Sequence, residues 1–261
     1  MRFQRPALVL TAAALLLSAC APPHPVFECP RFNDEVCEQE LEKGNLDRAD
    51  TYCDLGLEFS PEYAELWALK GRISLLRKDT AQAKRYLLHA LKLQPDHPKA
   101  LLNLGYTYLE EGAYAASYER FSQALRLKPD YHVARFGQGR ALWKLGRREE
   151  AQKELGAALE AAPDNVSFHH IFGMLNYTER NLEVAHQHLS RAAQLAPGST
   201  ILWQDLGKVL MEQGRFAEAE AAFLQCVQLE ETHADCRAGL ERARHEQPHP
   251  KTPQRLEMSR D

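Results

Sequence analysis

The sequence predicts an all-α fold: six helical hairpins of 34 residues stack into a right-handed superhelical solenoid, which a C-terminal capping helix closes. Three series of residues recur with this period, and a fixed period of this length is typical of solenoids. They are prolines at Pro61, Pro95, Pro129, Pro163 and Pro197, glycines at Gly71, Gly105, Gly139, Gly173 and Gly207, and small residues at Ala49, Ala83, Ser117, Ala151, Ala185 and Ala219. The predicted repeats are 30–63, 64–97, 98–131, 132–165, 166–199 and 200–233.

Each series has a physical reason. Proline lacks an amide donor and clashes inside a helix but suits its first turn, so the prolines should separate one hairpin from the next. Glycine and alanine are expected where two antiparallel helices approach most closely, despite the roughly 1 kcal/mol that glycine costs in a helix. Gly112, Gly146 and Gly214 fall between the two helices of a hairpin, where they predict turns.

The N-terminal segment 1–19 has the layout of a secretory signal peptide: Arg2 and Arg5 precede an apolar run from Ala7 to Leu17. That run is shorter than the roughly 20 residues of a membrane-spanning helix. The sequence Leu17-Ser18-Ala19-Cys20 resembles the bacterial lipoprotein box, which implies cleavage before Cys20 and acylation of its new terminus. Ala21 follows instead of an aspartate, and in such proteins this implies the periplasmic face of the outer membrane. Residues 20–29 would form a spacer.

Charge argues against a nucleic-acid partner. Removing residues 1–19 takes away two of the 32 basic residues and none of the 36 acidic ones, which leaves a net charge of 30 minus 36, or −6. Nucleic-acid binding usually requires a basic patch. The segment 234–246 reads as the capping helix with Leu240 facing inward, and 247–261 is expected to be disordered because it has three prolines and few apolar residues.

No motif for catalysis or cofactor binding is present. The eleven histidines do not form H-E-x-x-H, and G-x-S-x-G, P-loop and dinucleotide-binding patterns are absent. There is no C-x-x-C pair and no cysteine–histidine cluster at ligand spacing, so no metal site is predicted. We expect a binding protein, monomeric and without a cofactor, and not an enzyme.

The repeat unit resembles the tetratricopeptide pattern. That pattern places a large residue, then Leu-Gly, and later Ala, Phe or Leu, and Pro. The residues that carry the resemblance are Leu104-Gly105, Tyr108, Gly112, Tyr114, Phe121, Ala124 and Pro129, and in the last repeat Trp203, Leu206-Gly207, Phe216, Ala219 and Phe223. The resemblance covers about residues 30–233 and implies the fold more than any function.

The cysteines stand at informative positions of that pattern. In the first repeat Cys37 replaces the usual glycine and Cys53 the usual Phe or Leu, and both positions face the partner helix. This predicts a Cys37–Cys53 disulfide, with Cys29–Cys37, Cys29–Cys53 or two buried thiols as alternatives. Cys226 and Cys236 lie on either side of a short turn, where a second disulfide would fasten the capping helix.

In tetratricopeptide arrays the first helix of each repeat lines an inner groove. Its lining positions here are apolar and aromatic, which predicts that a polypeptide partner lies there. They are Leu75, Leu102, Tyr106, Phe136, Arg140, Trp143, His170, Met174, Tyr177, Ile201 and Met211. The alternative is that neighbouring repeats bury several of these side chains.

Lipoprotein signal, spacer and six repeats together resemble the PilF/PilW/Tgl family of type IV pilus pilotins, and Tgl-like members most closely. The resemblance implies an outer-membrane lipoprotein, anchored through Cys20, that binds secretin subunits of the pilus machine and promotes their insertion and multimerisation, as pilus-dependent motility requires. The alternative is a periplasmic adaptor that recruits peptidoglycan hydrolases or assists an outer-membrane assembly complex.

Overall fold

The computed structural model describes residues 30–246, with side chains from residue 33 onwards. The predicted signal peptide (1–19), lipidated Cys20, the spacer (20–29) with Cys29, and the predicted disordered tail (247–261) lie outside the described residues. Within the described residues, no helix combines the length and the hydropathy that a membrane span requires.

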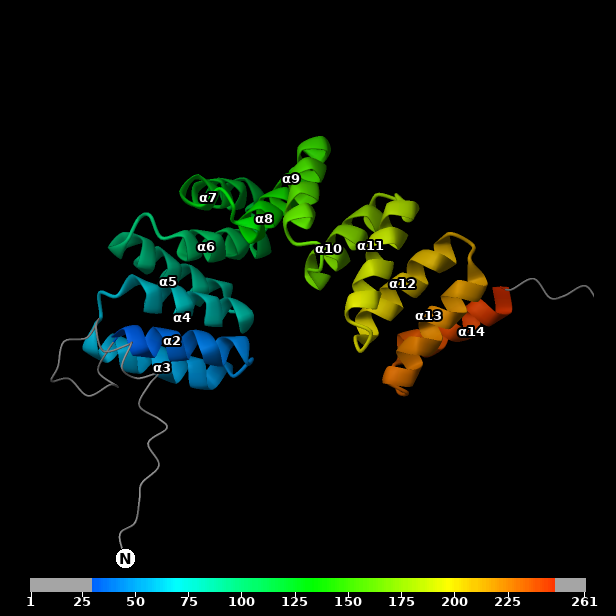
Figure 1. Cartoon of the computed structure of the whole chain (residues 1–261), viewed down its shortest axis with the longest axis horizontal. Helices are drawn as coiled ribbons and strands as arrows, with labels where there is room; N and C mark the ends of the chain where they lie inside the picture. Colours follow the sequence, from blue (N-terminus) through cyan, green and yellow to red (C-terminus); the bar gives the residue numbers. More distant parts are fainter. Residues whose placement is uncertain (1–29, 247–261) are drawn as a thin grey trace, which may run out of the picture. The chain divides into compact units, whose positions relative to one another are not determined.

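Thirteen α-helices and no strand make up the described part of the chain, and the helices pack in consecutive pairs (Figure 1). The pairs are α2 (Pro30–Glu42) with α3 (Leu46–Phe59), α4 (Ala64–Leu76) with α5 (Thr80–Leu93), α6 (Pro98–Glu110) with α7 (Tyr114–Leu127), α8 (His132–Lys144) with α9 (Arg148–Ala161), α10 (Val166–Thr178) with α11 (Leu182–Leu195), and α12 (Thr200–Glu212) with α13 (Phe216–Leu229). The last helix, α14 (Ala234–Glu246), lies where the capping helix was predicted, and Leu240 is buried.

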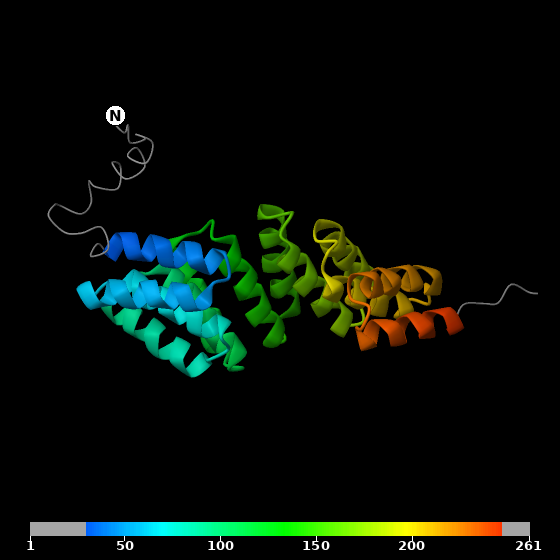
Figure 2. The same ribbon diagram turned by 90° about the horizontal axis from the view of Figure 1, so that it is seen from below.

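The chain divides into two compact units, Met1–Ala158 and Leu159–Asp261, and each is described by itself. In the first unit the hairpins follow one another side by side in both views (Figures 1 and 2). The first helices of successive hairpins also contact each other, α2 with α4, α4 with α6 and α6 with α8. In the second unit α10 contacts α12, and α12 contacts α14. Within each unit, successive first helices therefore pack against each other as well as against the second helices.

The turns inside the hairpins use the left-handed backbone region. Gly112, Gly146 and Gly214 have φ values of 76°, 79° and 72°, which confirms the predicted turns. Two hairpins make the same turn without glycine, at Lys78 (φ 63°) and Arg180 (φ 64°). The turn geometry thus comes from the hairpin, and glycine only lowers its cost.

Glycines on the first helices let large side chains of the second helices enter. The ring of Phe121 on α7 packs between Gly105 of its own hairpin and Gly137 of the next, so that a Cβ atom added at Gly137 would lie 2.5 Å from Phe121 Cε1. Phe223 on α13 lies in the same way between Gly207 and Gly239. A missing side chain on the next first helix therefore provides the space for a phenyl ring.

We expect Gly137→Ala to lower the free energy of unfolding by about 1–3 kcal/mol, because the added methyl group overpacks a buried ring. The matched control is Gly156→Ala on α9, where an added Cβ atom meets nothing within 4 Å. This variant should gain up to about 1 kcal/mol from helix propensity. Urea denaturation of both variants measures the difference, and equal midpoints would contradict the packing described for Phe121.

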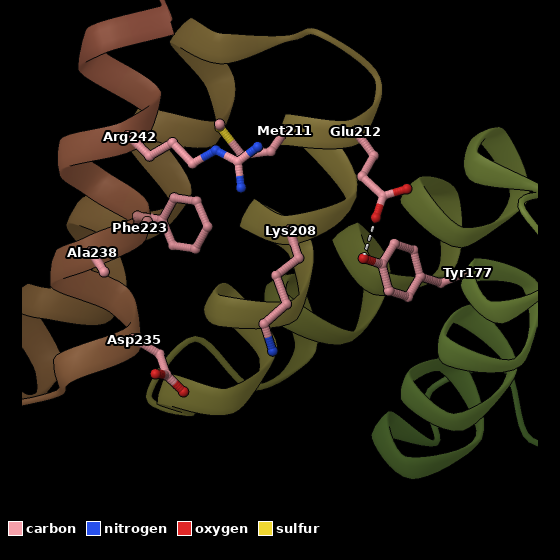
Figure 3. Close-up of a pocket in the computed structure, with 9 residues that line it drawn as sticks. Tyr177, Lys208, Met211, Glu212, Phe223, Asp235, Ala238 and Arg242 are labelled. Atoms are coloured by element: carbon pink, nitrogen blue, oxygen red, sulfur yellow. Dashed lines mark hydrogen bonds between the residues drawn. The ribbon is translucent and has the colours of Figure 1, made fainter.

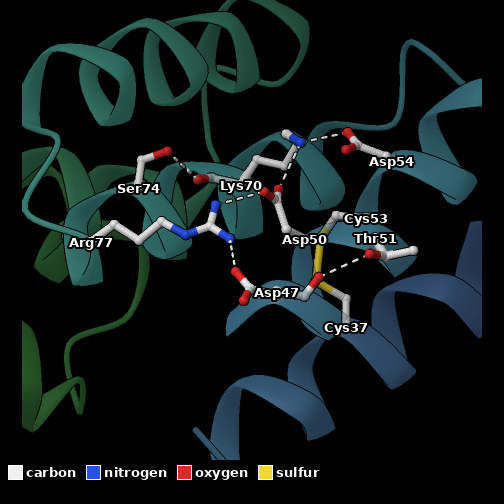
Figure 4. A network of polar contacts seen from close by, with 9 residues as sticks. All are labelled: Cys37, Asp47, Asp50, Thr51, Cys53, Asp54, Lys70, Ser74 and Arg77. Carbon is white, nitrogen blue, oxygen red and sulfur yellow. Dashed lines mark hydrogen bonds and ion pairs between the residues drawn. A yellow bond between two sulfur atoms is a disulfide. The ribbon is translucent and has the colours of Figure 1, made fainter. Parts of the chain in front are cut away.

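The first three helices are joined by a disulfide and an ion-pair network (Figure 4). Cys37 on α2 is bonded to Cys53 on α3, with Cα atoms 5.8 Å apart. Buried Lys70 on α4 pairs with Asp50 and Asp54 on α3, and its Nζ lies 2.8 Å from Asp50 Oδ1. Arg77, which caps the C-terminus of α4, pairs with Asp50 and Asp47 at 2.6 and 2.7 Å. A buried lysine needs such partners because desolvation penalises an unpaired charge.

Candidate functional site

The predicted groove residues do not form a continuous exposed surface. In the first unit the side chains of Leu102, Phe136 and Trp143 are only 8%, 1% and 3% exposed. Phe136 and Trp143 are therefore covered, as in the alternative that neighbouring repeats bury such side chains, whereas Leu102 still lines the pocket described below. The remaining predicted groove residues are partly buried (Leu75, Tyr106, Arg140, His170, Met174, Tyr177 and Met211), except Ile201, which is 46% exposed.

Tyr106 is held rigidly in the first unit. Its hydroxyl donates to the Val133 carbonyl at 3.2 Å, and its ring meets the ring of Phe121 edge to face at 5.0 Å. Burial raises the pKa of Tyr106 to about 12, against the opposing effect of Arg140, whose guanidinium lies 5.9 Å from the ring centroid. The phenol therefore stays neutral at physiological pH, its proton is used in the bond to Val133, and its ring offers an aromatic surface.

A pocket of about 290 Å³ lies on the first helices of the first unit. Its lining combines apolar, aromatic and charged side chains and comes from α2, α4, α6 and the start of α8. The lining residues are Glu38, Glu65, Ala68, Leu69, Arg72, Lys99, Leu102, Asn103, Tyr106, Tyr131 and Val133. Lys99 Nζ lies 3.0 Å from Glu38 Oε1 and 2.9 Å from Glu65 Oε1, so both carboxylates have a cation beside them.

Glu65 should make the first unit sensitive to acid. Burial alone would raise the pKa of Glu65, but hydrogen bonds from His97 and Lys99 outweigh it and lower the pKa to about 2. The ordinary value in the unfolded chain is 4.5. The resulting stability is present above pH 4.5 and is lost as the pH falls towards 2, because only the unfolded chain takes up the proton in that range.

The contribution of Glu65 should be on the order of 1–3 kcal/mol, reduced from the full shift because the carboxyl retains some contact with water. We expect the gap in unfolding free energy between the unmodified chain and Glu65→Gln to shrink between pH 6 and pH 3. Urea denaturation at both pH values measures this gap. An unchanged gap would mean that Glu65 keeps its ordinary pKa in the folded chain.

A second pocket, of about 370 Å³, lies on α10, α12 and α14 of the second unit with Phe223 of α13 at its base (Figure 3). Its lining residues are Tyr177, Lys208, Met211, Glu212, Phe223, Asp235, Ala238, Gly239 and Arg242. Tyr177 donates to Glu212 Oε1 at 2.5 Å, and Lys208 Nζ lies 3.0 Å from Asp205 Oδ1. The side chains of Lys208 and Arg242 are 43% and 73% exposed and can therefore reach a partner.

The two pockets use the same register of the repeat. Arg72 and Tyr106 line the first pocket, and Lys208 and Arg242, which lie at equivalent positions in later hairpins, line the second. The predicted groove contained Tyr106, Arg140 and Met174 of this register, while Arg72, Lys208 and Arg242 were not among its residues. The 34-residue step that connects Arg72, Tyr106, Arg140, Met174, Lys208 and Arg242 is the signal that would have found them.

Three of the predicted groove residues in the second unit lie in or beside the second pocket. Tyr177 and Met211 line the pocket. His170 lies beside it and contacts Asp205 Oδ2 at 2.8 Å, which helps to lower the pKa of that buried carboxyl against the effect of burial. Asp205 stays ionised and keeps Lys208 positioned at the edge of the pocket.

Comparisons with known proteins agree with this architecture. Two family models, both described as tetratricopeptide repeat, match residues 108–171 and 177–238 and residues 76–132, together more than half of the chain. The solved structure of PilF from Pseudomonas aeruginosa is similar with a TM-score of 0.64 and 18% identity, over 84% of this chain and 97% of PilF. PilW, described as a widely conserved type IV pilus biogenesis factor, is similar with a TM-score of 0.71 and 17% identity, over 81% of this chain and 98% of PilW.

A curated relative is the peroxisomal targeting signal receptor of Candida albicans, which is 22% identical over 224 residues. The match covers 82% of this chain but only 38% of the length of that receptor. At these low identities the comparisons show a shared fold alone. Repeats of this kind are scaffolds for other proteins, and neither matching model describes a catalytic family.

Proposed function

The chain belongs to the tetratricopeptide-repeat family, and on that premise we propose that it is an outer-membrane pilotin, which binds the type IV pilus secretin and promotes its membrane insertion and multimerisation. The extent of the structural similarity supports this proposal, because the hairpins of this chain match nearly the whole length of both PilF and PilW. The lipoprotein box at Cys20 and the short spacer add the anchoring that the role requires.

One observation carries the binding part of the proposal: each unit has a pocket on its first helices, lined by an aromatic side chain and by cations of one register. Tyr106 and Tyr177 offer aromatic surface, and Arg72, Lys208 and Arg242 offer charge. Aromatic and arginine side chains dominate the binding energy of many protein interfaces. Each pocket also has two carboxylates, Glu38 and Glu65 in the first and Glu212 and Asp235 in the second, so a complementary partner segment would carry both charges among its apolar side chains.

Lipid attachment would add to these contacts. Acyl chains on Cys20 confine the protein to the membrane surface, and two or more chains hold it there stably. Confinement raises the effective concentration of the pockets towards a membrane-inserting partner without any new contact. The anchor thus serves the assembly step, in which secretin subunits enter the same membrane.

The proposal is tested by capturing partners from cross-linked membranes of cells that produce the tagged chain. Secretin subunits should dominate the captured proteins, and they should be depleted when Cys20→Ala leaves the chain unanchored. Capture of peptidoglycan hydrolases or barrel-assembly components in place of secretin would favour the adaptor function instead. Failure of radiolabelled palmitate to enter the chain would contradict the anchoring part separately.

A further inference from the structure

Three side chains with metal-binding donor atoms meet where α13 joins α14. Cys226 lies on α13, His233 lies in the connecting loop, and Cys236 lies in the first turn of α14. Their donor atoms lie within 4.8 Å of one another. Both cysteines are fully buried and His233 is partly buried. Within residues 33–246 this is the one group of three such side chains that comes together.

In the structure the two cysteines form a disulfide with Cα atoms 6.1 Å apart. His233 is fixed beside it, because its Nδ1 accepts a hydrogen bond from the Cys236 amide at 3.4 Å. A disulfide bond does not require a histidine beside it. The other disulfide, Cys37–Cys53, has no such group around it within the described residues.

We propose that this cluster binds one Zn²⁺ ion when its disulfide is reduced, through the thiolates of Cys226 and Cys236 and the one unprotonated nitrogen of His233, which gives up its hydrogen bond from the Cys236 amide to do so. Zinc favours thiolate and imidazole ligands in a tetrahedral arrangement, with bonds of about 2.3 Å to sulfur and about 2.0 Å to nitrogen. Donors in such a site lie roughly 3.5–4 Å apart. The cluster reaches this spacing when the two sulfur atoms separate after their bond breaks.

The chemistry balances with a dithiol as reductant. The dithiol passes two electrons and two protons to the disulfide and becomes a disulfide itself, which leaves two thiols on Cys226 and Cys236. Zn²⁺ then displaces the two thiol protons, and water occupies the fourth position. The start of α14 assists, because a helix N-terminus favours the thiolate over the thiol.

Both states would hold the capping helix in place. Leu240 and Ala243 of α14 belong to one core cluster with Phe223 and Leu206, and the bond between α13 and α14 keeps them together. In oxidising surroundings the disulfide provides that bond. In reducing surroundings the zinc ion would link α13 to α14 instead. The redox state would then change the zinc content of the protein, while α14 stays attached in both states.

Zinc titration of the purified full chain tests the proposal, before and after reduction with a phosphine that offers no thiolates of its own. The reduced chain should bind one more equivalent of zinc than the oxidised chain. His233→Ala should weaken this binding by about tenfold or more. Cys37→Ser with Cys53→Ser is the matched control and should leave it unchanged, which is checked alongside circular dichroism of every variant.

Background binding by the other histidines is measured in Cys226→Ser with Cys236→Ser. Equal zinc content of this variant and of the reduced unmodified chain would overturn the proposal, and so would unchanged affinity in His233→Ala. One further measurement uses only the unmodified chain, so that misfolding of a variant cannot affect its result. Cadmium added to the reduced chain should produce thiolate charge-transfer absorption, and its absence would equally refute the site.

Discussion

Replacing both Phe136 and Trp143 with alanine should unfold most of the chain. Both side chains are almost fully buried, and truncating a buried aromatic residue costs about 3–5 kcal/mol because it removes contacts and leaves a cavity. The costs of the two truncations together approach or exceed the free energy of unfolding of many domains, which is about 5–15 kcal/mol. Trp143 also carries the guanidinium of Arg148 on its ring, 4.9 Å from the ring centroid.

Circular dichroism with urea denaturation measures this effect. Ile201→Ala, another predicted groove residue but 46% exposed, is the control and should change stability by less than about 0.5 kcal/mol. If the double variant kept its unfolding midpoint and lost only partner binding, Phe136 and Trp143 would line an open groove, as the sequence analysis expected.

Removing the Cys37–Cys53 disulfide should cost about 3 kcal/mol. The bridge closes a short loop, with a sequence separation of 16, and chain-entropy estimates for loops of this length give about that value. Replacing both cysteines with alanine in fully buried positions adds a small loss of packing. We expect the unfolding midpoint to fall clearly under oxidising conditions.

The matched comparison is the same variant under reducing conditions. The gap between the unmodified chain and Cys37→Ala with Cys53→Ala should then largely close, because neither chain has the bridge. A gap that persists after reduction would assign the stabilisation to side-chain packing and not to the covalent bond.

The period of 34 residues was sufficient to predict the helical hairpins. The turn glycines and the inward-facing Leu240 follow from local rules, since a left-handed turn and a small residue at a close approach are decided by a few neighbouring positions. A related regularity was overlooked: side chains six residues after a repeat proline donate to its carbonyl. Trp67 bonds to Pro61 at 2.7 Å and Trp203 to Pro197 at 2.8 Å.

The binding surface was harder to predict, because a register identifies the face of a helix but not what covers it. Phe136 is covered although it occupies a groove position, while Lys208 and Arg242 remain accessible. Whether a position is open depends on the size of its neighbours, as with Phe121, which fits only beside Gly137. The cluster of Cys226, His233 and Cys236 was missed for a similar reason, since its spacing matches no familiar zinc motif.

The proposed function requires that the pockets on the first helices bind the secretin. A photo-crosslinking amino acid introduced in living cells at Arg72 or Arg242, one in each pocket, tests it most directly. Leu88 and Leu229 on second helices, each 45% exposed, are the control positions. Secretin adducts should form from Arg72 and Arg242 and should be absent from the two control positions. Adducts from Leu88 and Leu229 alone, or adducts with proteins other than the secretin, would contradict it.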